Sequence, residues 1–344
     1  FSVTQGLLYS QIHTDEFWYV YEARAIAEYS DVFNHRLPLQ SYVYGIYGRL
    51  FGTDILTLRM LSVCLFIFSI FIFLYFLIVV KKNNPVSTLL AALIFCHPFL
   101  IDMAATVTSY SLSIFLLVVF IILFEQSKFY QAIVPFLSLY LTRYTVDFSI
   151  FVFPAAAILS KINKKIYFNL SVFMILIVAI LFIDQQTFKN TFLFNLAVKD
   201  FQIERGILSN DVFKSFTYLR KLEFLAFFML LPVVALLFLN IKIKDLFSSN
   251  NLVYLIFIFG GFSYYWLTFN DYPITKLIFF PLIAILVAKL AVDNFLTKLT
   301  IILVGVSFFY MPNLILKNEN IVKSTNVCEF ISCESTDVLA LNPI

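Results

Sequence analysis

Long apolar stretches that contain no charged residue dominate the pattern along this chain. Residues 65–80, for example, show neither a charge nor an alternation of apolar and polar positions. A membrane-spanning helix needs about 20 mainly apolar residues in a row, whereas strands of a membrane barrel alternate with a period of two. The pattern therefore predicts spanning helices over residues 60–80, 86–101, 110–125, 129–142, 145–160, 166–183, 222–240, 251–269, 274–292 and 299–316.

Residues 1–11 are also mainly apolar and look like the outer end of one further span. Eleven residues cannot cross a hydrocarbon core of about 30 Å, so we expect the native chain to extend upstream. The predicted fold is all-α, a polytopic transmembrane bundle of about 11 spans whose first is truncated. One membrane domain over residues 1–316 contains outer loops at 12–59 and 184–221 and is followed by a short extracytoplasmic tail, 317–344.

Composition narrows the class of protein. Of the 344 residues 61% are apolar and 13% charged, with 43 Phe and 19 Tyr, and the mean hydropathy is +0.90. Soluble domains carry about 25% charged residues, and disordered chains are poor in aromatic residues. An ordinary soluble enzyme and a disordered chain are both excluded, and much of the surface is expected to face lipid.

Positive charge is divided between the two sides that these spans define. On one side the basic residues are all lysines: Lys81, Lys82, Lys128, Lys161, Lys164, Lys165, Lys242, Lys244, Lys289 and Lys298. We expect this side to be cytoplasmic. The other side receives all seven arginines: Arg24, Arg36, Arg49, Arg59, Arg143, Arg205 and Arg220. Guanidinium groups suit phosphate, but ordinary pairing with outer carboxylates explains any one of them equally well.

Motifs for other functions are absent from the sequence. It contains no Gly-rich nucleotide loop and no zinc-type Cys/His cluster, which argues against an ATP-driven transporter. Few ionisable residues lie well inside the spans, with Asp147 the clearest case, whereas ion-coupled carriers need such groups. In the tail, Cys328 and Cys333 fit a disulfide or two free thiols. Any chemistry is therefore expected at the outer surface.

The first outer loop carries the most informative residues. Residues 13–29 predict a helix in the headgroup layer, with Phe17, Val20, Tyr21, Arg24 and Glu28 near one face. Thr14 or Asp15 can cap its start, so an ordinary N-cap is one interpretation of Asp15. A second short interfacial helix follows and ends at a glycine, before the Leu58-Arg59 pair that opens the next span.

Several short motifs occur in order on the outer side. They are Asp15-Glu16, Glu22-Ala-Arg24, Pro38-Leu39, Arg49-Leu-Phe-Gly52, Leu58-Arg59, then His97-Pro-Phe-Leu-Ile-Asp102, Ser109-Tyr110-Ser-Leu, Leu141-Thr-Arg143 and Asp271-Tyr272-Pro-Ile-Thr-Lys276. This order resembles the GT-C membrane glycosyltransferases, in particular the branch of protein O-mannosyltransferases and bacterial lipid A aminoarabinose transferases. Lys276 stands where that family commonly has Arg.

The resemblance implies an inverting sugar transfer from a polyprenyl-phosphate donor to an extracytoplasmic glycan, lipid or protein, at the outer face of the plasma (inner) membrane. It implies Asp15 as the base, because a carboxylate ionised at neutral pH can accept the acceptor's proton. Glu16 is either a second acid or a charge at the helix start. Arg59, Arg143 and Lys276 are candidates to stabilise the phosphate leaving group, although Arg143 can instead pair with Asp147.

Further candidate residues have open alternatives. Asp102 orients the acceptor, or holds a divalent metal together with Asp15, or is a plain charge at a span boundary. Arg24, Tyr110 and Tyr272 are candidate substrate contacts. His35 and Arg36 either contact the donor or acceptor or form an interfacial cap. Loop 184–221 is either a lid or an interfacial segment. No cofactor besides the candidate metal is expected, and the expected partners are the donor, the acceptor and membrane lipids, without nucleic acid. A lipid-carrier flippase and a catalytically silent subunit of an envelope-polysaccharide complex remain the alternative functions.

Overall fold

The computed structural model describes residues 14–28, 38–142, 151–160, 163–183, 249–267, 278–291 and 293–306. All regular secondary structure in these ranges is helical, which confirms the all-α prediction for this part of the chain. Outside it lie the expected truncated span, the span at 222–240, loop 184–221, the Arg143–Asp147 pair, and the tail with its two cysteines.

The longest helix is α4, Ile55–Tyr75, which continues into a π-helical turn, Phe76–Val80 (η1). It begins five residues before the predicted span because Asp54 caps it, accepting a hydrogen bond from the backbone N–H of Thr57 at 2.9 Å. The hydroxyl and backbone N–H of Thr57 also lower the pKa of the Asp54 carboxyl. Within the described ranges, Ile55–Val80 is the one continuous helix long and apolar enough to cross a membrane.

Shorter helices follow α4. They are α5 (Pro85–Phe95), α6 (Pro98–Ala104), α7 (Ser109–Glu125) and α8 (Phe129–Thr142). The single span expected at 86–101 is wrong, because α5 ends at Phe95 and α6 starts after a break at Cys96 and His97. Pro98 explains the break, since proline has no N–H and disfavours a helical backbone at the residue before it.

The remaining helices are α9 (Val152–Leu159), α10 (Lys164–Ile183), α16 (Ser249–Leu267), α17 (Phe280–Leu290) and a last helix, Phe295–Val306. Each overlaps a predicted span. The described part of α17 starts later than the predicted residue 274, after a short 3₁₀ turn.

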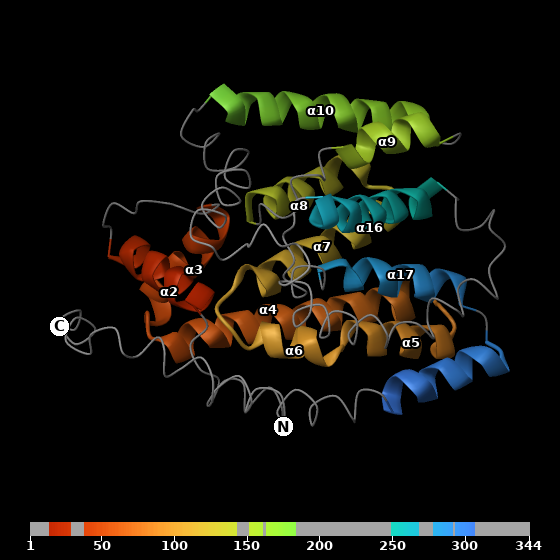
Figure 1. Cartoon of the computed structure of the whole chain (residues 1–344), viewed down its shortest axis with the longest axis horizontal. Coiled ribbons are helices and arrows are strands. Elements are labelled where there is room, and N and C mark those ends of the chain that lie inside the picture. The colour runs from red at the N-terminus through yellow and green to blue at the C-terminus, as the bar shows by residue number, and fades with distance from the viewer. Residues whose placement is uncertain are drawn as a thin grey trace, which may run out of the picture.

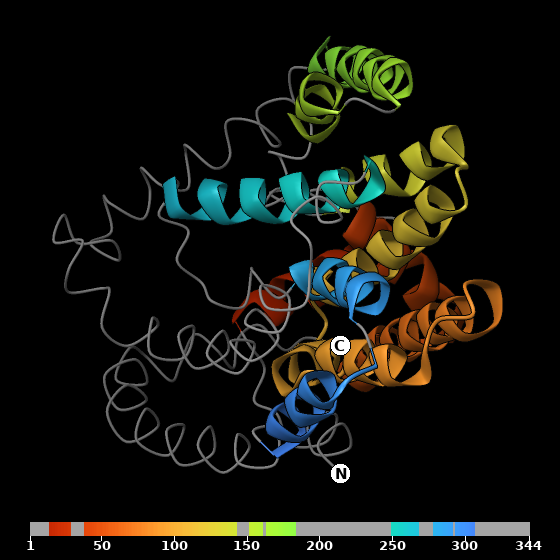
Figure 2. The same ribbon diagram turned by 90° about the vertical axis from the view of Figure 1, so that its right-hand side faces the viewer.

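The helices stack in layers (Figure 1): α9 and α10 lie along one edge, α8 and α16 come next, then α7 and α17, and α4 to α6 form the opposite edge. Figure 2 keeps this order and shows α16 lengthwise where α10 is nearly end-on, so these two helices run in different directions. The contacts of α7 with α8, of α4 with α7 and of α5 with α17 join the layers.

Phenylalanine packing fills the centre of the bundle. Phe120 of α7 contacts Phe136 of α8 and Phe153 of α9, with ring centroids 5.0 and 6.4 Å apart. All three side chains are buried, and they belong to one continuous apolar core that also includes residues of α4, α5, α16 and α17. Tilted and edge-on ring pairs of this kind are favourable beyond the area they bury.

One end of the bundle is held by Glu125, the last residue of α7, whose side chain is 2% exposed. Its carboxylate oxygens lie 2.9 Å from the Nζ of Lys81 and 2.8 Å from the Nζ of Lys289. The hydroxyl of Tyr254 on α16 donates a hydrogen bond to the same carboxylate at 3.0 Å. Four segments far apart in sequence therefore meet at this end, which we call the lysine end.

Candidate functional site

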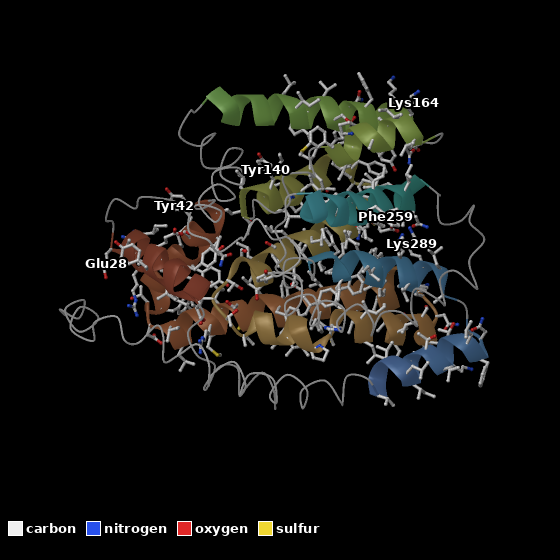
Figure 3. All side chains as sticks on the ribbon, in the orientation of Figure 1. Glu28, Tyr42, Tyr140, Lys164, Phe259 and Lys289 are labelled. Carbon is white, nitrogen blue, oxygen red and sulfur yellow. The ribbon has the colours of Figure 1, made fainter. Side chains whose placement is uncertain are left out.

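Helices α2 (Thr14–Ala27) and α3 (Pro38–Phe51) pack against each other and against the start of α4. We call this pair the cap. Figure 3 shows Glu28 and Tyr42 of the cap at one end of the molecule, and Lys164 and Lys289 toward the other. A small apolar core of its own holds the cap in place, made of Tyr19, Val20, Ala23, Tyr44, Leu58 and Val107.

The two cap helices approach closely at Gly45 of α3. A Cβ atom added there would lie 2.7 Å from the Cβ of Ile26 and 3.2 Å from the carbonyl oxygen of Ala23, both on α2. Glycine is therefore required for this contact. Gly52, with φ of 111°, ends α3 in a conformation that other residues rarely adopt, and this agrees with the predicted glycine stop.

A buried ion pair joins α2 to α4. The Nε and Nη2 atoms of Arg59 each donate a hydrogen bond to the Glu16 carboxylate at 2.7 Å, and the backbone N–H of Val107 donates to the same carboxylate at 2.8 Å. Glu16 is 0% exposed and Arg59 4%. Two-pronged, charge-assisted bonds of this type are strong and directional, so Glu16 fixes the first turn of α2 against the bundle.

Other buried polar contacts surround this pair. The hydroxyl of Ser41 donates to Glu22, which joins α3 to α2, and the amide of Gln40 donates to the carbonyl of Thr108 at 2.9 Å. Tyr44 shares a hydrogen bond with Ser62. Burial raises the pKa of the Tyr44 phenol above its usual value, so it stays protonated. The cap is thus tied to α4 and to the segment before α7 by polar contacts as well as by packing.

Asp15 lies in the first turn of α2, because the helix already includes Thr14. An N-cap residue would stand just before the first helical residue, so neither Thr14 nor Asp15 occupies that position in α2. Of the residues that helical periodicity groups near one face, Val20 is buried, whereas Tyr21, Arg24 and Glu28 are exposed. The buried face also carries Glu16, Tyr19, Glu22 and Ala23.

The structure locates several other predicted site residues. Arg59 lies at the cap and pairs with Glu16. Arg24 is exposed, and its Nε donates to the carbonyl of Thr53 at 3.0 Å, in the link between α3 and α4. Tyr110 is 9% exposed in the main core, and Asp102 belongs to α6. His35, Arg36, Arg143, Tyr272 and Lys276 lie outside the described ranges.

The part of the chain that the structure describes contains no group of three or more His, Cys, Asp and Glu side chains able to hold a metal ion. Glu16, the carboxylate next to Asp15, already binds Arg59 and the N–H of Val107. A hard cation needs several oxygen ligands, and the oxygens of Glu16 are occupied by hydrogen-bond donors.

Sequence reasoning missed Gln40, Ser41, Tyr44 and Ser62, which line the joint between the cap and α4. A signal was present for Ser62, because a serine one turn after Arg59 in an apolar span opening suggests a buried polar partner. Gln40 and Ser41 sit in a short segment without a charge, where nothing in the sequence indicates burial.

Comparison with models of protein families, with curated protein sequences and with solved structures finds no match to this chain.

Proposed function

We propose that the chain crosses a membrane several times. Large apolar side chains are exposed along its helices, for example Ile67 and Phe71 of α4 at 57% and 65%, and Phe168 and Leu176 of α10 at 60% and 57%. Soluble proteins rarely leave such continuous apolar surfaces open to water. The shorter apolar helices α5 and α7, which pack against α4, and α8 and α17, which pack against α7 and α5, support a multi-pass bundle.

We further propose that the protein is a GT-C-type inverting glycosyltransferase, which moves one sugar from a polyprenyl-phosphate donor to an extracytoplasmic acceptor. The motif order in the sequence suggests this class. One observation carries it: Asp15 stands in the first turn of a helix whose next residue, Glu16, is anchored to Arg59 at the end of the bundle opposite the lysines. That end is the one expected to face away from the cytoplasm.

The proposed reaction begins when Asp15 accepts the proton of an acceptor hydroxyl. The hydroxyl oxygen then attacks the anomeric carbon from the side opposite the phosphate, the bond from that carbon to the phosphate oxygen breaks, and polyprenyl phosphate leaves as an anion. Cations near the leaving oxygen lower the barrier. Since the charge of Arg59 is already balanced by Glu16, we assign both residues a positioning role and assign Arg143 and Lys276 to the phosphate.

The test replaces Asp15 by Asn and compares it with Glu28→Gln, which makes the same carboxylate-to-amide change at an exposed residue just after α2. Purified protein is incubated with defined polyprenyl-phosphate sugars and candidate acceptors, and the release of polyprenyl phosphate is followed. We expect Asp15→Asn to lower turnover by about 10²–10⁴-fold, the usual contribution of a general base, without changing expression or thermal stability. Glu28→Gln should match the wild type.

Normal turnover in Asp15→Asn contradicts the assignment of the base. Movement of the lipid-linked sugar across vesicles without release of polyprenyl phosphate supports a flippase instead. Absence of both activities in the wild type, with every donor tested, supports a silent subunit.

A further inference from the structure

An open groove of about 720 Å³ lies between α9 and α10, at the edge of the bundle farthest from α4. Nothing in the proposed transferase reaction uses it. Its walls are mainly apolar, and two lysines stand at one end. The residues that matter for its chemistry are Ala157, Ile158, Lys164, Lys165, Phe168 and Ile175.

The two lysines are adjacent in the first turn of α10 and both are exposed. Neither Lys164 nor Lys165 forms an ion pair with any carboxylate in the described part of the chain. They also stand at the positive end of the helix dipole, where cations are unfavourable and an anion is favoured. The mouth of the groove is therefore an unbalanced positive site.

The apolar part of the groove is long and open. Ile158 is 78% exposed, Phe168 60% and Ile175 57%. From Lys164 to Ile175 an α-helix rises about 16 Å, at about 1.5 Å per residue. One leaflet of a bilayer has a hydrocarbon depth of about 15 Å, half of the usual core. The groove thus matches the depth of a single leaflet, with its cations at the headgroup level.

We propose that this groove binds an anionic phospholipid of the cytoplasmic leaflet. The phosphate contacts the ammonium groups of Lys164 and Lys165, and an acyl chain lies along Ile158, Phe168 and Ile175. Charge complementarity selects an anionic headgroup over a zwitterionic one, because basic pockets between helices on the cytoplasmic side attract anionic lipids. The proposal rests on the membrane placement of the bundle and is independent of transferase activity.

A tryptophan reporter in the groove tests this. The two native tryptophans, Trp18 and Trp266, are replaced by Phe, and Phe168→Trp supplies the only tryptophan, whose fluorescence is excited selectively over that of tyrosine. The protein is reconstituted in vesicles of phosphatidylcholine that contain increasing fractions of phosphatidylglycerol brominated in its acyl chains, or of equally brominated phosphatidylcholine. A second reporter, Phe71→Trp on the exposed face of α4, reads ordinary lipid contact away from the groove.

We expect brominated phosphatidylglycerol to quench the reporter at 168 with an apparent affinity about 30-fold above that of brominated phosphatidylcholine, given the usual attraction of two lysines near a membrane surface. The reporter at 71 should show no preference. The double variant Lys164→Gln/Lys165→Gln should lose the preference at 168. Its matched control, Lys82→Gln/Lys128→Gln, removes two exposed lysines outside the groove and should keep it.

Three results would overturn the proposal: equal quenching by both lipids at position 168, an unchanged preference in Lys164→Gln/Lys165→Gln, or an equal loss in the control pair. The last would mean that general surface charge attracts the lipid. Circular dichroism of each variant checks that the helices are retained, and transferase activity measured in the same vesicles reports separately on the proposed function.

Discussion

The ion pair between Glu16 and Arg59 makes a quantitative prediction about how the cap is held. Both side chains are almost fully buried, and the carboxylate also accepts the N–H of Val107. Removing one member leaves the other charge buried without its counterion, which typically costs about 3–5 kcal/mol. We therefore expect Arg59→Met to lower the free energy of unfolding by an amount in that range, and Glu16→Gln by about 3 kcal/mol because the amide oxygen still accepts from Val107.

The double variant Glu16→Gln/Arg59→Met removes both charges together. It keeps a neutral acceptor for Val107 and replaces the guanidinium by an apolar side chain of similar length. We expect it to be less destabilised than the sum of the single variants by about 2–3 kcal/mol, as for other buried pairs in direct contact. Glu28→Gln, an exposed change next to the same helix, should alter stability by no more than about 0.5 kcal/mol.

The assay is reversible unfolding in mixed micelles with increasing mole fractions of sodium dodecyl sulfate, followed by circular dichroism. Four proteins complete the cycle: the wild type, the two single variants and the double variant. Strict additivity, with a coupling energy within about 0.5 kcal/mol of zero, would refute the view that this pair anchors α2. Single variants as stable as the wild type would refute it as well.

Three further predictions concern the fold. Gly45→Ala should destabilise the protein by about 1–3 kcal/mol through overpacking between the cap helices. Gly305→Ala, with open space at its Cβ, should be neutral or stabilising by up to about 1 kcal/mol in the same dodecyl sulfate unfolding assay. Asp54→Ala should lower the free energy of unfolding by about 0.5–2 kcal/mol at neutral pH through loss of the helix cap. Because the pKa of Asp54 is lowered in the folded protein, the difference between variant and wild type should disappear as the pH falls below the ordinary aspartate pKa and through the lowered pKa. A difference that stays constant with pH would contradict this prediction. Tyr254→Phe removes a buried hydrogen bond to the charged carboxylate of Glu125. It should lower the midpoint of unfolding in line with a loss of about 1.5–3 kcal/mol, with no change in helix content by circular dichroism.

The sequence predicted the helices well because an α-helix satisfies the backbone hydrogen bonds of a long apolar run within the run itself. The expected span at 129–142 matches α8, and that at 110–125 matches α7 within one residue. The predicted helix boundaries were wrong where a single residue ends or starts a helix within an apolar run. Pro98 divided an expected span, and Asp54 extended another by capping it earlier.

The site was less predictable because its key contacts join residues far apart in the chain. Glu16 and Arg59 are separated by 43 positions, and no helical periodicity relates them. The buried face of α2 was also hard to predict, since it contains two carboxylates, Glu16 and Glu22, that a hydrophobic pattern places outside. Their burial depends on partners supplied by α3 and α4.

The contacts around Glu125 have a mechanical consequence for the whole bundle. The end of α4, the end of α7, α16 and α17 converge on one carboxylate, whereas the cap joins only the opposite ends of the early helices. This carboxylate adds a polar link at one end to the apolar core that joins the helices along their length. The loss of Glu125 would therefore uncouple four segments at once and leave two lysines without a counterion, while the contacts of the cap would stay in place.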